Sequence, residues 1–148
     1  MEVVGLSSAR GRKRPASCVD QKSGFVATGF PSPADDYKEL GIDLNKELIP
    51  HPTSTFFLRV SGKSMKQIGI HNEDILIVDR SLNPKKGSVV IAVVNGKFTV
   101  NFLNYTKGVS SLEFGENQQN KIKLNNEEDI YIWGVVTHSI HQLRPIPH

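Results

Sequence analysis

The stretch SGKSM, residues 61–65, places Ser64 just after a glycine turn, where its hydroxyl could do covalent chemistry. The strand-like run TFFLRV precedes this turn, and the apolar run DILIVD follows it. A serine hydroxyl becomes a useful nucleophile only when a general base accepts its proton. The sequence must therefore supply a base close to Ser64 if this serine is catalytic.

Two kinds of residue can act as that base. The first is histidine, and the chain has five: His51, His71, His138, His141 and His148. None is placed in an order or spacing that marks a Ser/His/Asp triad, although triads assemble in space. The second is a lysine kept neutral by burial in an apolar pocket. Such a lysine would lie on an apolar strand that faces the serine turn, and KFTVNFL is the most obvious strand.

The pattern of the chain after residue 55 indicates a sheet that positions these groups. SVVIAVV and KFTVNFLNY are separated by Asn95–Gly96, the strongest short signal for a β-hairpin. SLEF and KIKL are weaker strands, and DIYIWGVVTHSIHQL predicts a long strand interrupted at Gly134. Helical signals are confined to residues 35–49. The expected fold is mainly β: a single curved, largely antiparallel β domain.

Composition limits the classes of function. The 148 residues suit one domain with a tail, and the formal net charge of +3 comes entirely from residues 1–22, which we expect to be mobile. The body has no basic stripe, so direct sequence-specific DNA binding is not expected. No run approaches the ~20 apolar residues of a membrane span. A single cysteine, Cys18, excludes an internal disulfide and a thiolate zinc site and fits the cytoplasm.

Four stretches together resemble the UmuD proteins, which belong to the LexA/UmuD group of self-cleaving serine proteases, peptidase S24. They are GFPSPADDY, HPTSTFFLRVSGKSM, GI(x)3DILIVD and VVIAVVNGKFTV. The similarity covers residues 25–143, and the combination is far more specific than any one stretch. It implies a catalytic domain of the LexA/signal-peptidase type that uses a Ser/Lys dyad.

The resemblance also implies a function. Proteins of this group cut off their own N-terminal arm when a RecA filament on single-stranded DNA stimulates them. By this resemblance Ser64 is the nucleophile and Thr28–Gly29 is the bond cut, although the family has Ala or Cys in place of Thr28. The expected division is an arm, residues 1–28, and a peptidase domain, residues 29–148. The expected partners are a second copy in a homodimer and a UmuC-type Y-family DNA polymerase of error-prone translesion synthesis in the SOS response.

The sequence departs from the family at the base. The family reads FTVK where this chain reads FTVN, so Asn101 occupies the lysine position. An asparagine amide can hydrogen-bond Ser64 but cannot accept its proton. Lys97 lies four residues upstream, roughly 13 Å away at ~3.3 Å per residue, and we expect Lys63 and Lys66 to point to solvent. Self-cleavage is therefore expected to be very slow or absent.

Other classes of function stay open. A LexA- or phage-type repressor needs a helix-turn-helix, which 28 residues cannot hold, but a repressor's C-terminal domain remains an alternative. A signal peptidase would need a membrane anchor. A non-catalytic dimeric module that holds a translesion polymerase is favoured by Asn101.

Three further side chains have structural interpretations. Met65 is expected to pack beneath the serine turn, and Trp133 in the core or a dimer interface. His138 and His141, three apart on a strand, point to opposite faces, so no shared metal is expected. No cofactor is predicted.

Overall fold

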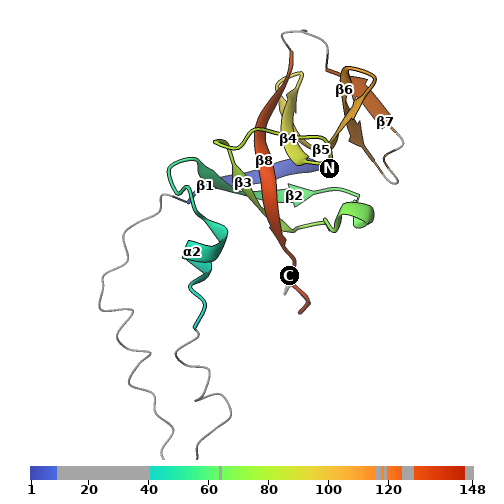
Figure 1. The fold of residues 1–148 in the computed structure, drawn as a ribbon. Coiled ribbons are helices and arrows are strands. Elements are labelled where there is room, and N and C mark those ends of the chain that lie inside the picture. Colours follow the sequence, from blue (N-terminus) through green and yellow to red (C-terminus); the bar gives the residue numbers. More distant parts are fainter. Residues whose placement is uncertain (10–40, 64, 116–117, 119, 125–128, 146–148) are drawn as a thin grey trace, which may run out of the picture.

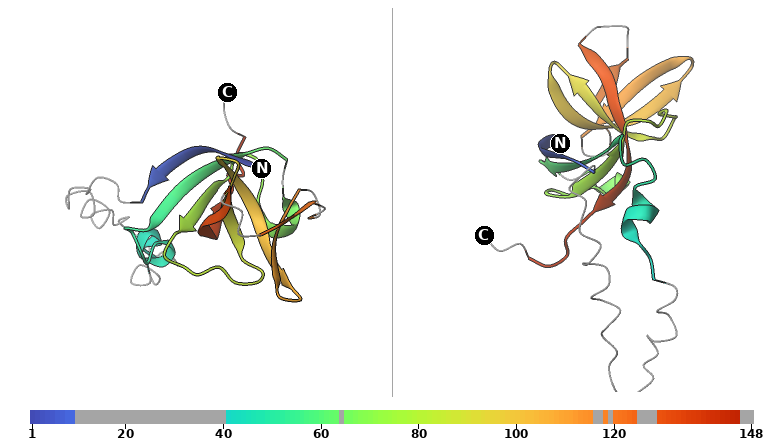
Figure 2. Two further views of the ribbon diagram at one scale, coloured as in Figure 1. Left: turned by 90° about the horizontal axis from the view of Figure 1, so that it is seen from above. Right: turned by 90° about the vertical axis from the view of Figure 1, so that its left-hand side faces the viewer.

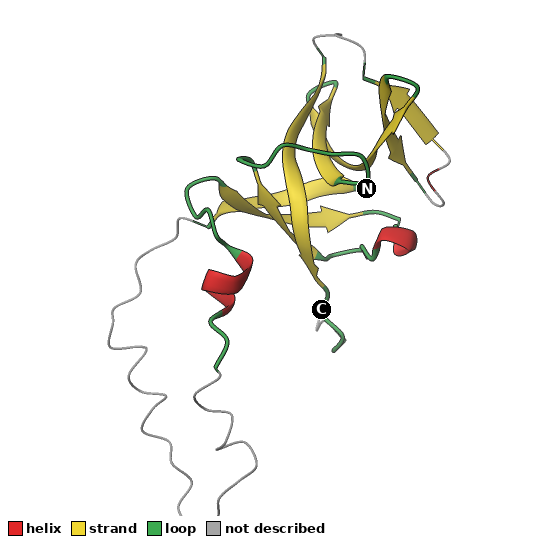
Figure 3. Cartoon of the chain, in the orientation of Figure 1, coloured by secondary structure: helices red, strands yellow, loops and turns green. Residues whose placement is uncertain are grey.

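Strands make up nearly all of the regular structure in the computed structural model, which describes residues 1–9, 41–63, 65–115, 118, 120–124 and 129–145 (Figures 1 and 3). The short helices are α2 (Leu44–Leu48) and the 3-10 turn η2 (Lys66–Ile68). The strands are β1 (Glu2–Ser8), β2 (Thr55–Ser61), β3 (Ile75–Asp79), β4 (Val89–Val94), β5 (Lys97–Thr106), β6 (Val109–Phe114), β7 (Asn120–Lys123) and β8 (Ile130–Ile140).

The strands form one antiparallel sheet in the order β1-β2-β3-β8-β4-β5-β6-β7. The sheet curves back on itself, because β1 also pairs with β5 through Glu2 and Thr99. By these pairings six strands form a closed ring. The β6–β7 hairpin extends from it, as Figure 2 shows. The predicted curved, largely antiparallel β domain is confirmed.

The β4–β5 hairpin forms where the sequence predicts it. Asn95 and Gly96 both have positive φ, 51° and 80°, which is the geometry of a type I′ turn. The turn fixes the register so that Val90 lies opposite Asn101. This pairing determines which face of β5 the candidate site residue occupies.

The helix predicted from DLNKELI also forms. Asp43 is its N-cap, and its carboxylate accepts a hydrogen bond of 3.0 Å from the backbone N–H of Asn45. None of the residues in α2 is buried, so the helix adds little to the core. The helix expected nearer residue 35 lies outside the described residues.

Two hydrophobic clusters occupy the interior. The larger joins β2, β3, β4 and β5 to the serine turn through eight buried residues: Leu58, Val60, Met65, Ile70, Leu76, Val78, Ile91 and Val100. The smaller lies between β4, β5, β6 and β8 and contains Val90, Ala92, Leu103, Leu112 and Val135. Trp133 packs against the larger cluster, with Phe56 and Phe98 at ring-centroid distances of 5.1 and 5.2 Å. Its predicted packing role is confirmed.

The structure corrects the expectation of a disordered arm from residue 1. Residues 2–8 form β1, which pairs with β2 from Glu2 opposite Ser61 to Ser8 opposite Phe56. The reason is that EVVGLSS carries a short β-branched run, and the outer edge of β2 offers unpaired backbone groups that such a run can satisfy. Residues 10–28 of the predicted arm lie outside the described residues.

A second correction concerns Gly134. Strand β8 continues through this residue, and the irregularity is a register shift against β4 between Ile91 and Ala92. The glycine is needed because neighbouring side chains approach its Cα: a Cβ there would lie 2.6 Å from Cγ1 of Val78, which is fully buried.

We therefore expect Gly134→Ala to destabilise the fold. The added methyl group would displace the side chain of Val78 in a close-packed core, at a cost of about 1–3 kcal/mol in the free energy of unfolding. Gly5→Ala in β1 is the matched control, since a Cβ there meets only ordinary contact at 3.6 Å. Urea denaturation of both variants measures the difference, and equal stability would contradict the crowding inferred at residue 134.

Candidate functional site

The turn around Ser64 is held in place by its neighbours, while Ser64 itself lies outside the described residues. Gly62 has a φ of 127°, and its backbone N–H donates a 2.9 Å hydrogen bond to Oδ1 of Asn72. Met65 and Ile70 exchange backbone hydrogen bonds of 2.9 and 3.3 Å across η2. Met65 is 4% exposed and belongs to the larger core cluster, as predicted. The residues on both sides of Ser64 are thus fixed to the body.

Asn101 is buried in β5 with an exposed fraction of 1%. Its amide nitrogen donates two hydrogen bonds to Thr99, one of 2.8 Å to the hydroxyl Oγ1 and one of 3.1 Å to the backbone carbonyl. Both N–H donors of this buried amide are therefore paired within β5.

The hydrophobic core and the N-terminus connect the serine turn to the strand that carries Asn101. Met65, next to Ser64, and Val100, next to Asn101, belong to the same buried cluster. The N-terminus of the chain bridges the same two segments: the backbone N–H of Val100 donates to the carbonyl of Met1 at 3.2 Å. A Cβ on Gly62 would lie 3.3 Å from the Cα of Met1.

No lysine is buried in the interior that the structure describes. Lys63, Lys66 and Lys97 are all exposed, which confirms the expectation that the first two face solvent. Lys121 is exposed as well, and its Nζ lies 3.2 Å from Oε1 of Glu113 in an ion pair. The buried polar and charged residues that the structure describes are Thr55, Asp74, Asp79, Asn101, Ser111 and Glu113, and none can act as an amine base.

A small open depression lies beside the serine turn. Its volume is about 170 Å³, including the part open to solvent. Residues of the serine turn and of the loop between β6 and β7 line it: Met65, Gln67, Ile68, Gly115 and Gln118. The predicted scissile residues Thr28 and Gly29 lie outside the described residues.

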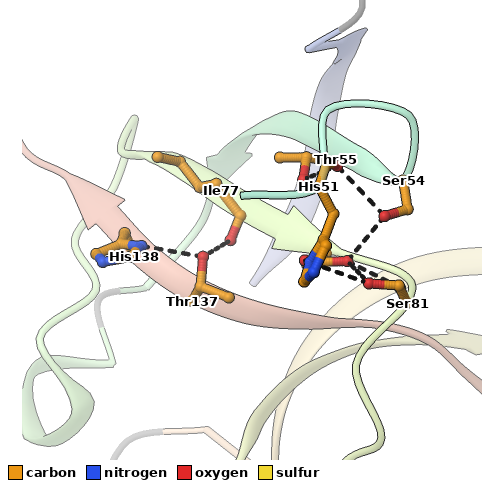
Figure 4. Close-up of polar contacts among 8 residues, drawn as sticks. His51, Ser54, Thr55, Ile77, Ser81, Thr137 and His138 are labelled. Carbon is orange, nitrogen blue, oxygen red and sulfur yellow. Dashed lines mark hydrogen bonds and ion pairs between the residues drawn. The ribbon is translucent and has the colours of Figure 1, made fainter. Parts of the chain in front are cut away.

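One cluster contains serine, histidine and aspartate but lacks the geometry of a catalytic triad (Figure 4). Asp79, at the end of β3, is contacted by Nδ1 of His51 at 2.6 Å and by the hydroxyls of Ser81 and Ser54 at 2.6 and 3.1 Å. Ser81 thus contacts the carboxylate and the same ring nitrogen, at 3.3 Å, rather than the opposite nitrogen. A triad needs the serine on Nε2 when Nδ1 faces the aspartate. The cluster instead joins the turn before β2 to the end of β3.

The pKa of Asp79 reflects this environment. Burial raises it, but hydrogen bonds from the Ser81 hydroxyl, His51, the Ser81 backbone N–H and Ser54 together lower the pKa to about 2, from a usual value of 3.8. Because the folded-state pKa is depressed, the carboxylate stabilises the fold above pH 4, and this stability is lost as the pH falls from 4 to 2.

We expect the free energy of unfolding to lose about 2 kcal/mol of Asp79-dependent stability between pH 4 and pH 2. Asp79→Asn should be less stable at pH 7 and should fall less steeply across this range. Asp43→Asn is the control, because asparagine is an equally good N-cap for α2. Denaturation at each pH measures the slopes, and an unchanged slope in Asp79→Asn would rule out this role.

A second cluster, which the sequence did not reveal, lies at the start of β3, around Asp74. Asp74 is 1% exposed, and its carboxylate contacts Nδ1 of His141 at 2.6 Å and faces Nδ1 of His71 at 3.7 Å. The two imidazole rings stack with centroids 4.4 Å apart. His141 and Asp74 are 67 residues apart in the chain, so no local pattern predicts their contact. His138 instead contacts Thr137, at 3.0 Å.

Comparisons with known proteins agree with this fold. The family model described as Peptidase S24-like matches residues 21–137. Protein ImpA of Salmonella typhimurium is 46% identical over 118 residues, which cover 80% of each chain. Protein MucA of Escherichia coli is 39% identical over 115 residues, 78% of this chain and 79% of MucA. Protein SamA of Salmonella typhimurium is 40% identical over 116 residues, 78% and 80% of the two chains.

The chain belongs to the S24-like peptidase family. Its relatives place it within that family among the UmuD-like proteins of SOS mutagenesis. None of the helices in the part of the chain that the structure describes is long and apolar enough to cross a membrane.

Proposed function

We propose that the protein is a UmuD-like accessory factor of error-prone translesion DNA synthesis in which self-cleavage at Thr28–Gly29 is slow or lost. Family membership supports the first part of this proposal. One observation carries the second: Asn101, at the position of the family's lysine, is a buried amide bonded to Thr99.

The chemistry of peptide cleavage explains why this substitution matters. In the proposed reaction Ser64 Oγ would attack the carbonyl carbon of Thr28, and the hydroxyl proton must leave as that bond forms. The Asn101 amide cannot accept this proton. Loss of a general base typically lowers the rate by about 10²–10⁴-fold. We therefore assign Ser64 the position of the nucleophile and Asn101 the position of an absent base.

The proposed partners are those of the UmuD proteins. They are a second copy of the chain in a homodimer, the RecA filament on single-stranded DNA, and a UmuC-type Y-family polymerase. Direct sequence-specific DNA binding is not part of the proposal.

A second candidate is a purely non-catalytic dimeric module that holds the polymerase. The two hydrogen bonds from the Asn101 amide nitrogen to Thr99 support it, because they pair the N–H donors of a neutral side chain within β5. The two candidates differ in whether the remaining groups still form a latent protease.

Asn101→Lys separates them. If only the base is missing, this variant should release residues 1–28 at least about 100-fold faster than the wild-type chain. The rate should rise with pH, because a buried lysine must lose its proton to act as a base. Mass spectrometry after incubation with RecA, ATP and single-stranded DNA identifies the cut and its rate.

Two controls make the result specific. Asn101→Lys combined with Ser64→Ala should not cleave, and Asn101→Gln, which keeps an amide, should behave as the wild type. Wild-type cleavage as fast as that of Asn101→Lys would overturn the proposed loss of activity. If Asn101→Lys keeps the wild-type melting temperature yet does not cleave, the chain is a non-catalytic module.

A further inference from the structure

The cluster of His71, Asp74 and His141 has the donor set of a transition-metal site. One ligand atom from each residue lies within 4.8 Å of the others. We propose that these three residues bind a divalent transition-metal ion, with Zn²⁺ as the representative, through Nδ1 of both histidines and one carboxylate oxygen of Asp74. This site lies outside the proposed Ser64 chemistry and does not depend on it.

The separations suit a metal ion. Zn²⁺ binds histidine nitrogen and carboxylate oxygen at about 2.0–2.2 Å, so two ligand atoms of a tetrahedral site lie about 3.4 Å apart. Nδ1 of His141 lies 2.6 Å from Oδ1 of Asp74, and Nδ1 of His71 lies 3.7 Å from Oδ2 of the same carboxylate, so each ring nitrogen is close to a carboxylate oxygen. The side chains of His71 and His141 are 39% and 40% exposed, so their rings have room to rotate until both Nδ1 atoms face one ion.

The carboxylate is held ready by the backbone around it. Oδ2 of Asp74 accepts a 2.8 Å hydrogen bond from the backbone N–H of His71, and the Asp74 carbonyl accepts one of 3.1 Å from Val60. Hydrogen bonds of this kind orient a metal ligand before the ion arrives. They leave Oδ1 of Asp74 directed at His141.

Comparison with Asp79 shows why a cation fits here. Both aspartates are buried and both contact a histidine, but Asp79 also receives hydrogen bonds from two serine hydroxyls and a backbone N–H. Asp74 has fewer such donors and a second imidazole instead. Nδ1 of that imidazole, His71, is buried and has no hydrogen-bond partner among the described residues. A buried carboxylate beside an imidazole nitrogen without a hydrogen-bond partner is an environment that a metal ion stabilises.

The ion would join distant parts of the chain. His71 follows Ile70, which pairs with Met65 in the serine turn, and His141 directly follows the end of β8. A bound metal would therefore fasten this turn to the C-terminal strand. The three protein ligands leave a fourth position for water.

Zinc binding to the untagged full-length chain tests the site. Isothermal titration should show one Zn²⁺ per chain, and the melting temperature should rise with Zn²⁺ concentration, because an ion that binds only the folded state stabilises it. His141→Gln and His71→Gln should each lower the affinity at least about tenfold. His138→Gln changes a histidine of β8 that lies three residues before His141 and outside the cluster, and it should bind as the wild type does.

A spectroscopic readout separates coordination from a merely structural role. Co²⁺ in place of Zn²⁺ should give visible absorption bands of a low-symmetry N/O site in the wild type and His138→Gln, and these bands should vanish in His141→Gln. Circular dichroism of each metal-free variant establishes that it is folded. The proposal is overturned if the wild type binds no Zn²⁺ below about 1 mM. It is equally overturned if His138→Gln weakens binding as much as His141→Gln, or if folded His71→Gln and His141→Gln both retain full affinity.

Discussion

The larger hydrophobic cluster is the constraint on which the candidate site depends. It contains Met65 from the serine turn and Val100 from β5, together with residues of β2, β3 and β4. Burial of this apolar surface holds together segments that the chain order keeps far apart. Met65 adjoins Ser64 in the chain and Val100 adjoins Asn101, so this cluster gives the serine turn and β5 a common frame.

That frame is completed by β1, which pairs with β2 and reaches β5 (Figure 1). The backbone of Met1 lies against Gly62 on one side and bonds to Val100 on the other. The N-terminus of the chain thus occupies the space between the serine turn and the strand of Asn101. A segment that pairs with the outer edge of β2 would have to displace β1, since each strand edge accepts only one neighbour.

Two buried aspartates, Asp74 just before β3 and Asp79 at its end, show how similar residues acquire different roles. Asp79 is surrounded by serine hydroxyls and a backbone N–H as well as His51, and these hydrogen bonds keep it charged and structural. Asp74 faces two stacked imidazoles, one of them with an unsatisfied nitrogen among the described residues. The difference lies in the number and kind of donors around each carboxylate, which decides between a hydrogen-bonded anchor and a metal ligand.

The sequence by itself determined the parts of the molecule that depend on neighbouring residues. The β4–β5 hairpin follows from Asn95–Gly96 between β-branched runs, and the alternation of side chains predicted most strands of the sheet. The identity of Asn101, and hence the absence of an amine there, is also a property of the sequence alone. Only the tertiary structure decided that β1 closes the ring, that the Asn101 amide bonds to Thr99, and that His141 meets Asp74 across 67 positions. Local patterns encode backbone preference over a few residues, whereas these contacts depend on strand order and register, which only the packing of the whole core fixes.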